Sequence, residues 1–282
     1  MPTVSTPDGV RLHYEDCGSG LPIVFVHEFA GDGRSWAPQV HHFSRRYRCI
    51  TYSARGYPPS DVPPSSDAYS QDAARDDILA VMDGLGIERA HVVGLSMGAF
   101  ATLHFTMRYP HRVIGAVVAG CGYGAHPDEY AEFQAAAQVN ARVMLEQGMA
   151  HMAATYGHGP ARLQFRDKDP EGFATFVRQF AEHSALGSAN TMLGYQGRRP
   201  SLYSLKDAMA GIETPLLVVA GDEDDSTLEP SLMMKRTIRS AGLVMLPQSG
   251  HVLNLEEPAL FNQVVEEFFH QVERDRWVVR PR

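Results

Sequence analysis

A serine between two glycines could act as a nucleophile in this chain. Residues 94–98 read GLSMG, with Ser96 at the centre, a strongly β-forming run before it and a segment of helical spacing after it. A serine in a tight turn between a strand and a helix needs small residues two positions away on each side, so that the two elements can pass closely. Gly94 and Gly98 meet this need. We therefore predict that Ser96 projects above a sheet, with the Met97 amide at the positive end of the helix.

A serine hydroxyl is a weak nucleophile until a neighbouring base takes its proton. The C-terminal third of the chain offers a base, His251, after one apolar run, and the acids Asp222, Asp224 and Asp225 after another. Both positions follow predicted strands, and the carboxyl ends of parallel strands lie at one edge of a sheet. These side chains can therefore converge on Ser96 in the order serine, acid, histidine.

The elements that must position these residues follow from the pattern of apolar residues. Nearly continuous apolar runs, typical of strands buried on both faces, occupy residues 21–27, 48–53, 90–95, 112–120, 214–221 and 242–247. Residues 10–16 alternate apolar and polar positions, as a half-buried strand does. Helical spacing occupies residues 70–86, 96–110, 229–240 and 256–272. Strands that alternate with helices predict an α/β fold with a mostly parallel, doubly wound sheet.

The alternation stops between about Cys121 and Ile212, where two amphipathic helical stretches, 128–148 and 169–183, replace the strands. An all-helical insertion between parallel strands is most simply a cap over the carboxyl edge of the sheet. We therefore expect a core formed by residues 1–121 and 212–272 and a cap formed by residues 122–211. Residues 273–282 contain four arginines around Trp277, and we predict a solvated tail there.

Taken together, these motifs resemble the α/β-hydrolase superfamily, in particular its capped, esterase-like members. The resemblance covers nearly all of residues 1–270 and depends on the following matches: His27-Glu28-Phe29, Arg55-Gly56, Gly94 to Gly98, Gly221 to Asp224, and Gly250-His251. It implies that Asp224, the fourth residue of a Gly-x-x-Asp segment, is the acid, with Asp222 second and Asp225 third. It also implies that the backbone amides of Phe29 and Met97 form the oxyanion hole.

One residue departs from the family pattern near the expected site. Glu28 stands where members of the family usually have glycine, and its carboxylate would either face the substrate or turn away into a local hydrogen bond. The family's other acid position, after the strand that ends near Gly120, holds no acidic residue. Pro58 replaces a more usual glycine, and we interpret residues 55–60 as a rigid structural loop.

The cap is expected to choose the substrate. The run YQGRRPSLY, residues 195–203, closes the insertion where the chain must approach the site. A guanidinium in this run could hold a substrate carboxylate with paired hydrogen bonds, unless both arginines are solvated or pair with acidic residues of the cap. The candidate substrate-binding residues are Glu28, Tyr123, Tyr195, Arg198, Arg199 and Val252.

Composition limits the other classes of function. A formal net charge of -8 without a basic block disfavours nucleic acid as a partner. Three widely spaced cysteines argue against a disulfide framework or a zinc site. The N-terminal residues show neither a signal peptide nor a membrane anchor, so we expect a cytoplasmic protein that acts on a small molecule. We expect no cofactor and no metal. The sequence leaves open whether the protein forms a homo-oligomer.

The predicted chemistry is acyl transfer through an acyl-enzyme, with a small carboxylic ester, lactone or thioester as substrate. One alternative is hydrolysis of a carbon–carbon bond in a diketone or ring-cleavage product, but related enzymes of that kind often have asparagine where this chain has Leu95. Serine at position 96 also disfavours haloalkane dehalogenases and epoxide hydrolases, whose nucleophile is usually aspartate. A third alternative is a ligand receptor that has lost turnover, which a complete triad would make improbable.

Overall fold

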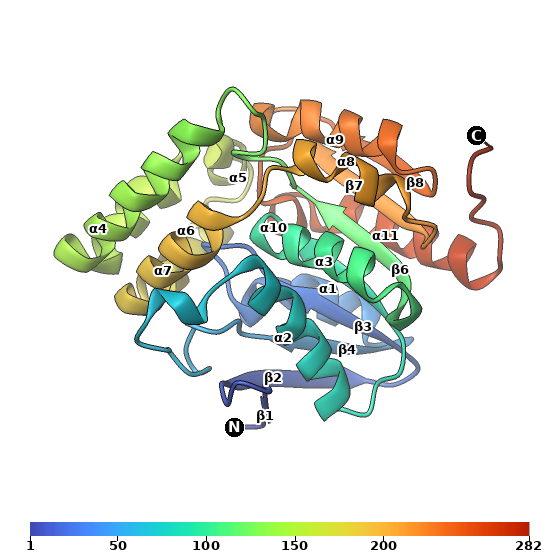
Figure 1. The fold of residues 1–282 in the computed structure, drawn as a ribbon, viewed down its shortest axis with the longest axis horizontal. Coiled ribbons are helices and arrows are strands. Elements are labelled where there is room, and N and C mark those ends of the chain that lie inside the picture. The colour runs from blue at the N-terminus through green and yellow to red at the C-terminus, as the bar shows by residue number, and fades with distance from the viewer. Residues whose placement is uncertain (282) are drawn as a thin grey trace.

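The computed structural model describes residues 1–281, and within them one sheet of eight strands organises the chain. The strands are β1 (Thr3–Ser5), β2 (Arg11–Gly18), β3 (Leu21–Val26), β4 (Tyr47–Tyr52), β5 (Ala90–Leu95), β6 (Val113–Ala119), β7 (Leu216–Gly221) and β8 (Ala241–Leu246). Their order in space is β1-β2-β4-β3-β5-β6-β7-β8, with β2 antiparallel to both neighbours and all later pairs parallel (Figure 1).

Both faces of the sheet are buried, as the continuous apolar runs require. In β3, Ile23 and Phe25 belong to one hydrophobic cluster, and Val24 and Val26 belong to the other. Helices α2 (Gln71–Gly84), α3 (Met97–Arg108), α8 (Lys206–Ala210) and α9 (Asp225–Thr237) cover one face, and α1 (Ala37–Phe43), α10 (Leu253–Glu256) and α11 (Pro258–Glu273) cover the other (Figure 1). The predicted fold class is therefore confirmed, although sequence reasoning missed the short elements β1 and α1.

Between β6 and β7 the chain forms a helical insertion. Residues 120–215, all of which the structure describes, contain no strand. Helices α4 (Tyr130–Thr155), α5 (Leu163–Lys168), α6 (Pro170–Ala181) and α7 (Ala185–Asn190) lie together at one end of the sheet, on the left of Figure 1. Helix α4 is interrupted at Gly148, which adopts a φ of 80°. The division into folding units at residues 122 and 211 stays a prediction.

The prediction of a solvated C-terminal tail is wrong for part of that segment. The Trp277 ring packs edge-on against Phe268, with the ring centroids 4.7 Å apart, and its Nε1 donates a hydrogen bond to Ser240. A Cβ at position 242 would lie 2.5 Å from the Trp277 ring, so Gly242 makes room for it. Burial of an aromatic ring in such a space, away from water, stabilises the folded chain. Arg274 and Arg276 are exposed, and Arg282 lies outside the described residues.

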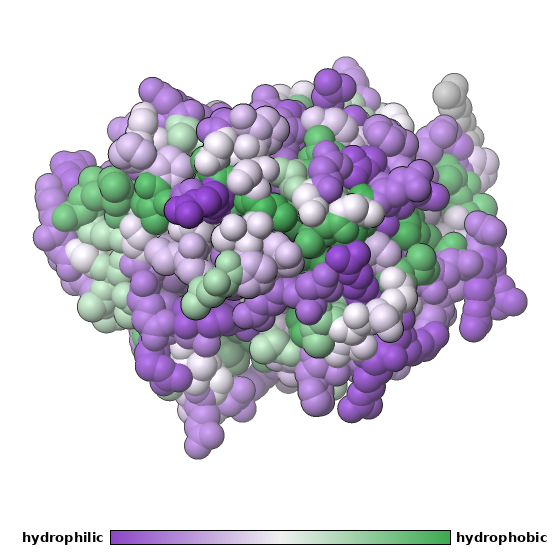
Figure 2. Space-filling view, turned by 90° about the horizontal axis from the view of Figure 1, so that it is seen from below, coloured by the Kyte–Doolittle hydropathy of each residue, from purple (hydrophilic) through white to green (hydrophobic). Residues whose placement is uncertain are grey.

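Polar side chains cover most of the face in Figure 2, and apolar residues gather in smaller patches between them. Among residues 1–281, no helix combines the length and the apolar character that crossing a bilayer demands. All three cysteines are free: Cys49 and Cys121 are buried and Cys17 is exposed.

Candidate active site

The turn at Ser96 joins β5 to α3 and has the geometry expected of a nucleophile elbow. Ser96 adopts φ 52° and ψ -114°, in a region of positive φ that residues with side chains rarely occupy. A Cβ on Gly94 would lie 2.3 Å from the Gly98 carbonyl oxygen, and one on Gly98 would lie 2.1 Å from the Val26 carbonyl oxygen. Because backbone atoms make these contacts, neither glycine can be replaced without moving a strand or the helix.

Ser96, His251 and Asp224 form an unbroken chain of hydrogen bonds. His251 Nε2 lies 2.8 Å from Ser96 Oγ, and His251 Nδ1 lies 2.6 Å from Asp224 Oδ2. Asp222 and Asp225 are exposed, and a carboxylate oxygen of Asp222 accepts a hydrogen bond from the Ser249 amide instead. Of the three acids that the sequence leaves open, the structure therefore brings Asp224 to the histidine.

Burial and pairing act in opposite directions on this histidine and its partner. Burial opposes protonation of the His251 ring, but the charge and hydrogen bond of Asp224 together outweigh it, so the pKa of His251 lies above its ordinary value of 6.5. Burial alone would raise the pKa of Asp224, yet the pairing with His251 holds it below its ordinary value. Asp224 is therefore ionised at neutral pH, and its charge favours the protonated form of the His251 ring.

Two buried tyrosines hold the residues that should form the oxyanion hole. Met97 is the first residue of α3, where helix amides have no partner inside the helix. Tyr195 donates a hydrogen bond from its hydroxyl to the Met97 carbonyl oxygen over 2.7 Å, and Tyr57 donates one to the Phe29 carbonyl oxygen over 3.0 Å. Tyr195, expected to bind substrate, thus supports the elbow.

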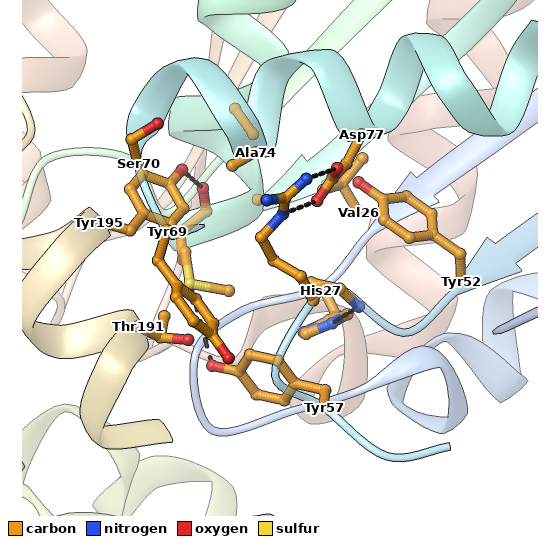
Figure 3. Close-up of a pocket in the computed structure, with 15 residues that line it drawn as sticks. Val26, His27, Tyr52, Tyr57, Tyr69, Ser70, Ala74, Asp77, Thr191 and Tyr195 are labelled. Carbon is orange, nitrogen blue, oxygen red and sulfur yellow. Dashed lines mark hydrogen bonds and ion pairs between the residues drawn. The ribbon is translucent and has the colours of Figure 1, made fainter. Parts of the chain in front are cut away.

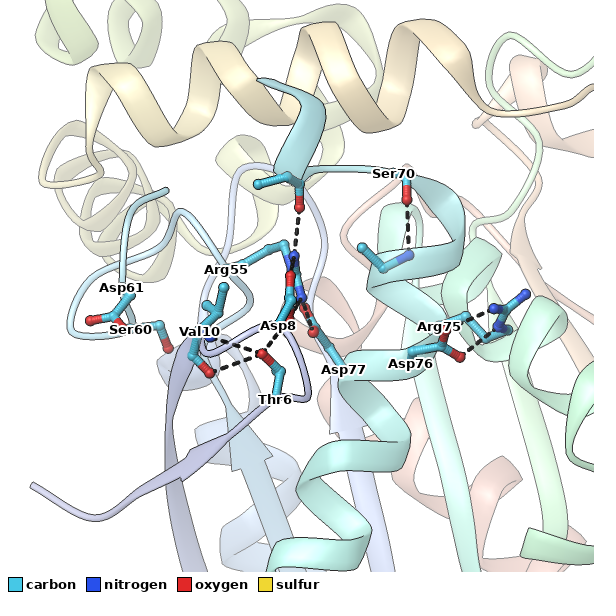
Figure 4. A network of polar contacts seen from close by, with 12 residues as sticks. Thr6, Asp8, Val10, Arg55, Ser60, Asp61, Ser70, Arg75, Asp76 and Asp77 are labelled. Atoms are coloured by element: carbon cyan, nitrogen blue, oxygen red, sulfur yellow. Dashed lines mark hydrogen bonds and ion pairs between the residues drawn. The ribbon is translucent and has the colours of Figure 1, made fainter. Parts of the chain in front are cut away.

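The loop of residues 55–60 supports this arrangement from behind. Arg55 is buried between Asp77 and Asp8, at 2.6 Å and 2.8 Å, and so ties the loop to α2 and to the N-terminal residues (Figure 4). Figure 3 shows that Tyr57 of this loop and Tyr195 of the cap line the same small apolar pocket behind the elbow. The structural interpretation of this loop agrees with these contacts.

Two cavities meet at His251. The inner pocket, of about 20 Å³, is lined by residues that include Ser96, Phe133, Asn140, Gln196 and Arg199. The outer cavity, of about 720 Å³, is lined by residues that include Arg162, Gln164, Asp222 and Asp224. Tyr123, Tyr156 and His251 line both. The inner pocket has room for about one water molecule, whereas the outer cavity can take most of a small organic molecule.

The two neighbouring arginines of the cap have opposite surroundings. Arg198 is exposed and pairs with Asp67 at 3.0 Å, so the structure does not bring it to the site, contrary to its place among the candidates. Arg199 is buried, its guanidinium stacks on Phe100 and Phe133 at 3.8 Å and 4.6 Å, and it lines the inner pocket with Ser96. The guanidinium donates hydrogen bonds to Gln196 and to the Tyr123 carbonyl oxygen.

The remaining candidates have different positions. Tyr123 is half-exposed where the two cavities join. Glu28 lines neither cavity, because its carboxylate turns away and accepts a hydrogen bond from the guanidinium of Arg162 at 2.8 Å. Val252 is buried at the start of α10 and also lines neither cavity.

Sequence reasoning missed Arg162 and Tyr156. Both flank a Gly-His-Gly-Pro break, residues 157–160, within an otherwise helical insertion. This break was the available signal, because glycine and proline mark a turn where a cap can dip toward the core.

Comparison with known proteins agrees with this geometry. Residues 22–258 match the family described as the alpha/beta hydrolase fold. The chain belongs to this family. It is 27% identical to 3-oxoadipate enol-lactonase 2 of Acinetobacter baylyi, over 93% of this chain and 94% of that one. It is 25% identical to the (E)-2-((N-methylformamido)methylene)succinate hydrolase of the same organism, over 94% and 96%. A solved thermophilic esterase from Thermogutta terrifontis superposes with a TM-score of 0.85 at 25% identity, covering 96% and 98% of the two chains. The chain is thus an α/β hydrolase.

Proposed function

We propose that this α/β hydrolase cleaves a carboxylic ester or lactone through an acyl-enzyme on Ser96. The observation that carries the proposal is the continuous hydrogen-bonded chain from Ser96 through His251 to Asp224. Ser96 Oγ attacks the carbonyl carbon while His251 Nε2 takes its proton, and the same histidine then protonates the leaving alkoxide. A water molecule, deprotonated by His251, releases the acid and restores Ser96.

The oxyanion of each tetrahedral intermediate would be bound by the amides of Phe29 and Met97. Removing one such donor in other enzymes costs about 10²- to 10³-fold in rate, so holding both residues in place is worth several kcal/mol of barrier. The hydroxyls of Tyr57 and Tyr195 hold the two residues in place through hydrogen bonds to their carbonyl oxygens.

We further propose that the preferred ester carries a carboxylate, which Arg199 binds. Within residues 1–281, no carboxylate lies within 4.0 Å of the Arg199 guanidinium, although the side chain is buried. Burial lowers the pKa of Arg199 to about 10, which still leaves it charged at neutral pH. A buried ion without a counter-ion costs several kcal/mol, and each desolvated contact with an aromatic ring returns only about 2 kcal/mol. An anion in the inner pocket would therefore gain strongly from this cation.

The size of the cavities and the names of the relatives support this substrate class. The inner pocket has room for about one water molecule, so its lining side chains must move apart to admit a carboxylate, and the bulk of the substrate must lie in the outer cavity. The relatives include an enol-lactonase named for 3-oxoadipate and a hydrolase named for a substituted succinate, both of which are carboxylate compounds.

A turnover panel tests the proposal. The purified protein is given matched methyl and p-nitrophenyl esters with and without a terminal carboxylate, lactones, and a vinylogous diketone. We expect turnover of esters and lactones, with a higher kcat/KM for the carboxylate-bearing member of each pair, and no turnover by Ser96→Ala. Turnover of the diketone alone would assign the site to carbon–carbon bond hydrolysis, and binding without turnover would assign it to a receptor.

A further inference from the structure

One segment of the cap touches both loops that the proposed chemistry depends on. In residues 159–162, the Ala161 carbonyl oxygen accepts a hydrogen bond from the His251 amide at 2.7 Å. The next residue, Arg162, donates to the Glu28 carboxylate at 2.8 Å, and Glu28 directly precedes Phe29. The approach to His251 is close, because a Cβ at Gly250 would lie 2.3 Å from the Ala161 carbonyl oxygen.

The ion pair at this contact is almost entirely buried, with Arg162 at the edge of the outer cavity. Glu28 is 1% exposed and Arg162 is 6% exposed. The Arg162 guanidinium also lies over the Tyr156 ring at 5.1 Å, so the cap holds it from a second side. Among the described residues, Glu28 Oε1 and Arg162 Nε have no hydrogen-bond partner. A buried ion pair with unsatisfied atoms contributes little net stability, because desolvation consumes most of the attraction. A role other than stability is therefore needed to explain it.

We propose that the Glu28–Arg162 ion pair is a positioning device that fastens the oxyanion loop to the cap segment already bound to the His251 loop. The pair then sets the Phe29 amide and the His251 ring at a fixed separation. This inference rests on the proposed function, since it assigns a task to the same site. It also explains why position 28 holds glutamate, although glycine would leave the loop free of this contact with the cap.

The pair also balances charge beside the histidine. The titratable groups that face His251 are Asp224 on the acid loop, Glu28, Arg162, Tyr123 and Tyr156, with Asp222, Glu223 and Asp225 exposed at the outer cavity. Beyond burial, which lowers the pKa of His251, and Asp224, which raises it, Arg162 lowers that pKa and Glu28 raises it. Removing one partner should therefore shift the histidine in one direction, and removing the other should shift it in the opposite direction.

Three variants, Glu28→Gln, Arg162→Gln and the double variant, test the inference with a neutral p-nitrophenyl ester. A neutral ester is used so that a direct bond between Arg162 and a substrate carboxylate cannot contribute. We expect each single change to lower kcat by about 10- to 100-fold with little change in KM, as misplacement of catalytic groups does. The acid limb of the pH profile of kcat/KM should move to lower pH in Glu28→Gln and to higher pH in Arg162→Gln. The double variant should return it close to wild type.

The matched control is Glu182→Gln, which breaks an exposed ion pair between cap and core, to Arg34 at 2.7 Å, and leaves Arg34 paired with Asp32. It should leave kcat and the pH profile unchanged. The rate at which a fluorophosphonate labels Ser96 gives a second readout, which needs no natural substrate.

The outcomes separate the two proposals. If the wild type does not label at Ser96, the proposed function fails. If Ser96 labels in the wild type, and the variants lose melting temperature but keep wild-type kcat, labelling rate and acid limb, the pair is only structural and the inference is overturned. If either single variant fails to fold because it leaves a buried ion unpaired, the double variant, which leaves neither the carboxylate nor the guanidinium, decides the question through its kcat and labelling rate.

Discussion

The core side and the cap side of the active site treat charge differently. On the core side, the buried carboxylate of Asp224 accepts hydrogen bonds from His251 and Ser226, so its charge is matched within the protein. On the cap side, the buried cation of Arg199 has neutral hydrogen-bond partners and aromatic rings around it. The difference indicates that the two sides have different roles. We infer that the core supplies the catalytic groups, whereas the cap keeps a charge that a substrate can match.

The largest effect is expected from a change of the acid on the core side. Asp224→Asn should lower kcat by about 10³- to 10⁴-fold, because the histidine loses the partner that fixes its tautomer and stabilises its charged form. Asp222→Asn is the matched control and should remain close to wild type, since Asp222 is exposed and contacts the Ser249 amide. Steady-state kinetics on one ester measure both variants. The opposite ranking would move the acid to Asp222.

A smaller effect tests the unmatched charge of the cap. Arg199→Gln should lower kcat/KM for a carboxylate-bearing ester by about 10- to 100-fold relative to its neutral counterpart, as the loss of a charge-assisted hydrogen bond would. The neighbouring variant Arg198→Gln, in an exposed pair with Asp67, should leave that preference unchanged. Equal preference in all three proteins would show that the cap selects its substrate by apolar contacts.

The smallest expected effect is a shift in the pH dependence of kcat/KM, which tests the pairing of His251 with Asp224 on the core side. His251 must be neutral to take the serine proton, so kcat/KM should fall as the pH falls through the pKa of His251. Because pairing with Asp224 raises that pKa, the acid limb should lie above pH 6.5, and in Asp224→Asn it should move to lower pH. A profile of kcat/KM from acid to neutral pH measures it. An acid limb at the same pH in Asp224→Asn as in the wild type would show that Asp224 does not contact His251.

The core side could be predicted from the sequence because its residues follow strands whose ends must meet. Ser96 and His251 each stand at such an end, so their convergence followed from the alternation of strands and helices. The residues alone left three acids open, and only the resemblance to a family selected Asp224. The structure agrees with that selection because Asp224 turns inward and Asp222 turns to solvent.

The cap side could not be read in the same way. Residues 196–198 form a single tight helical turn, so Arg198 and Arg199 diverge, and no sequence periodicity fixes which of them faces inward. The partner of Glu28 is 134 positions away, in a segment without a regular pattern. The docking of Trp277 likewise depends on a gap at Gly242 that the linear sequence does not reveal.

Covalent labelling directly tests whether Ser96 is the nucleophile of an acyl-transfer reaction. The protein is incubated with a fluorophosphonate, digested, and examined by mass spectrometry to locate the modified residue, with Ser96→Ala as the control. We expect stoichiometric modification of Ser96 and an unlabelled, folded, inactive Ser96→Ala protein. Modification of a different serine, or turnover retained by Ser96→Ala, would contradict it.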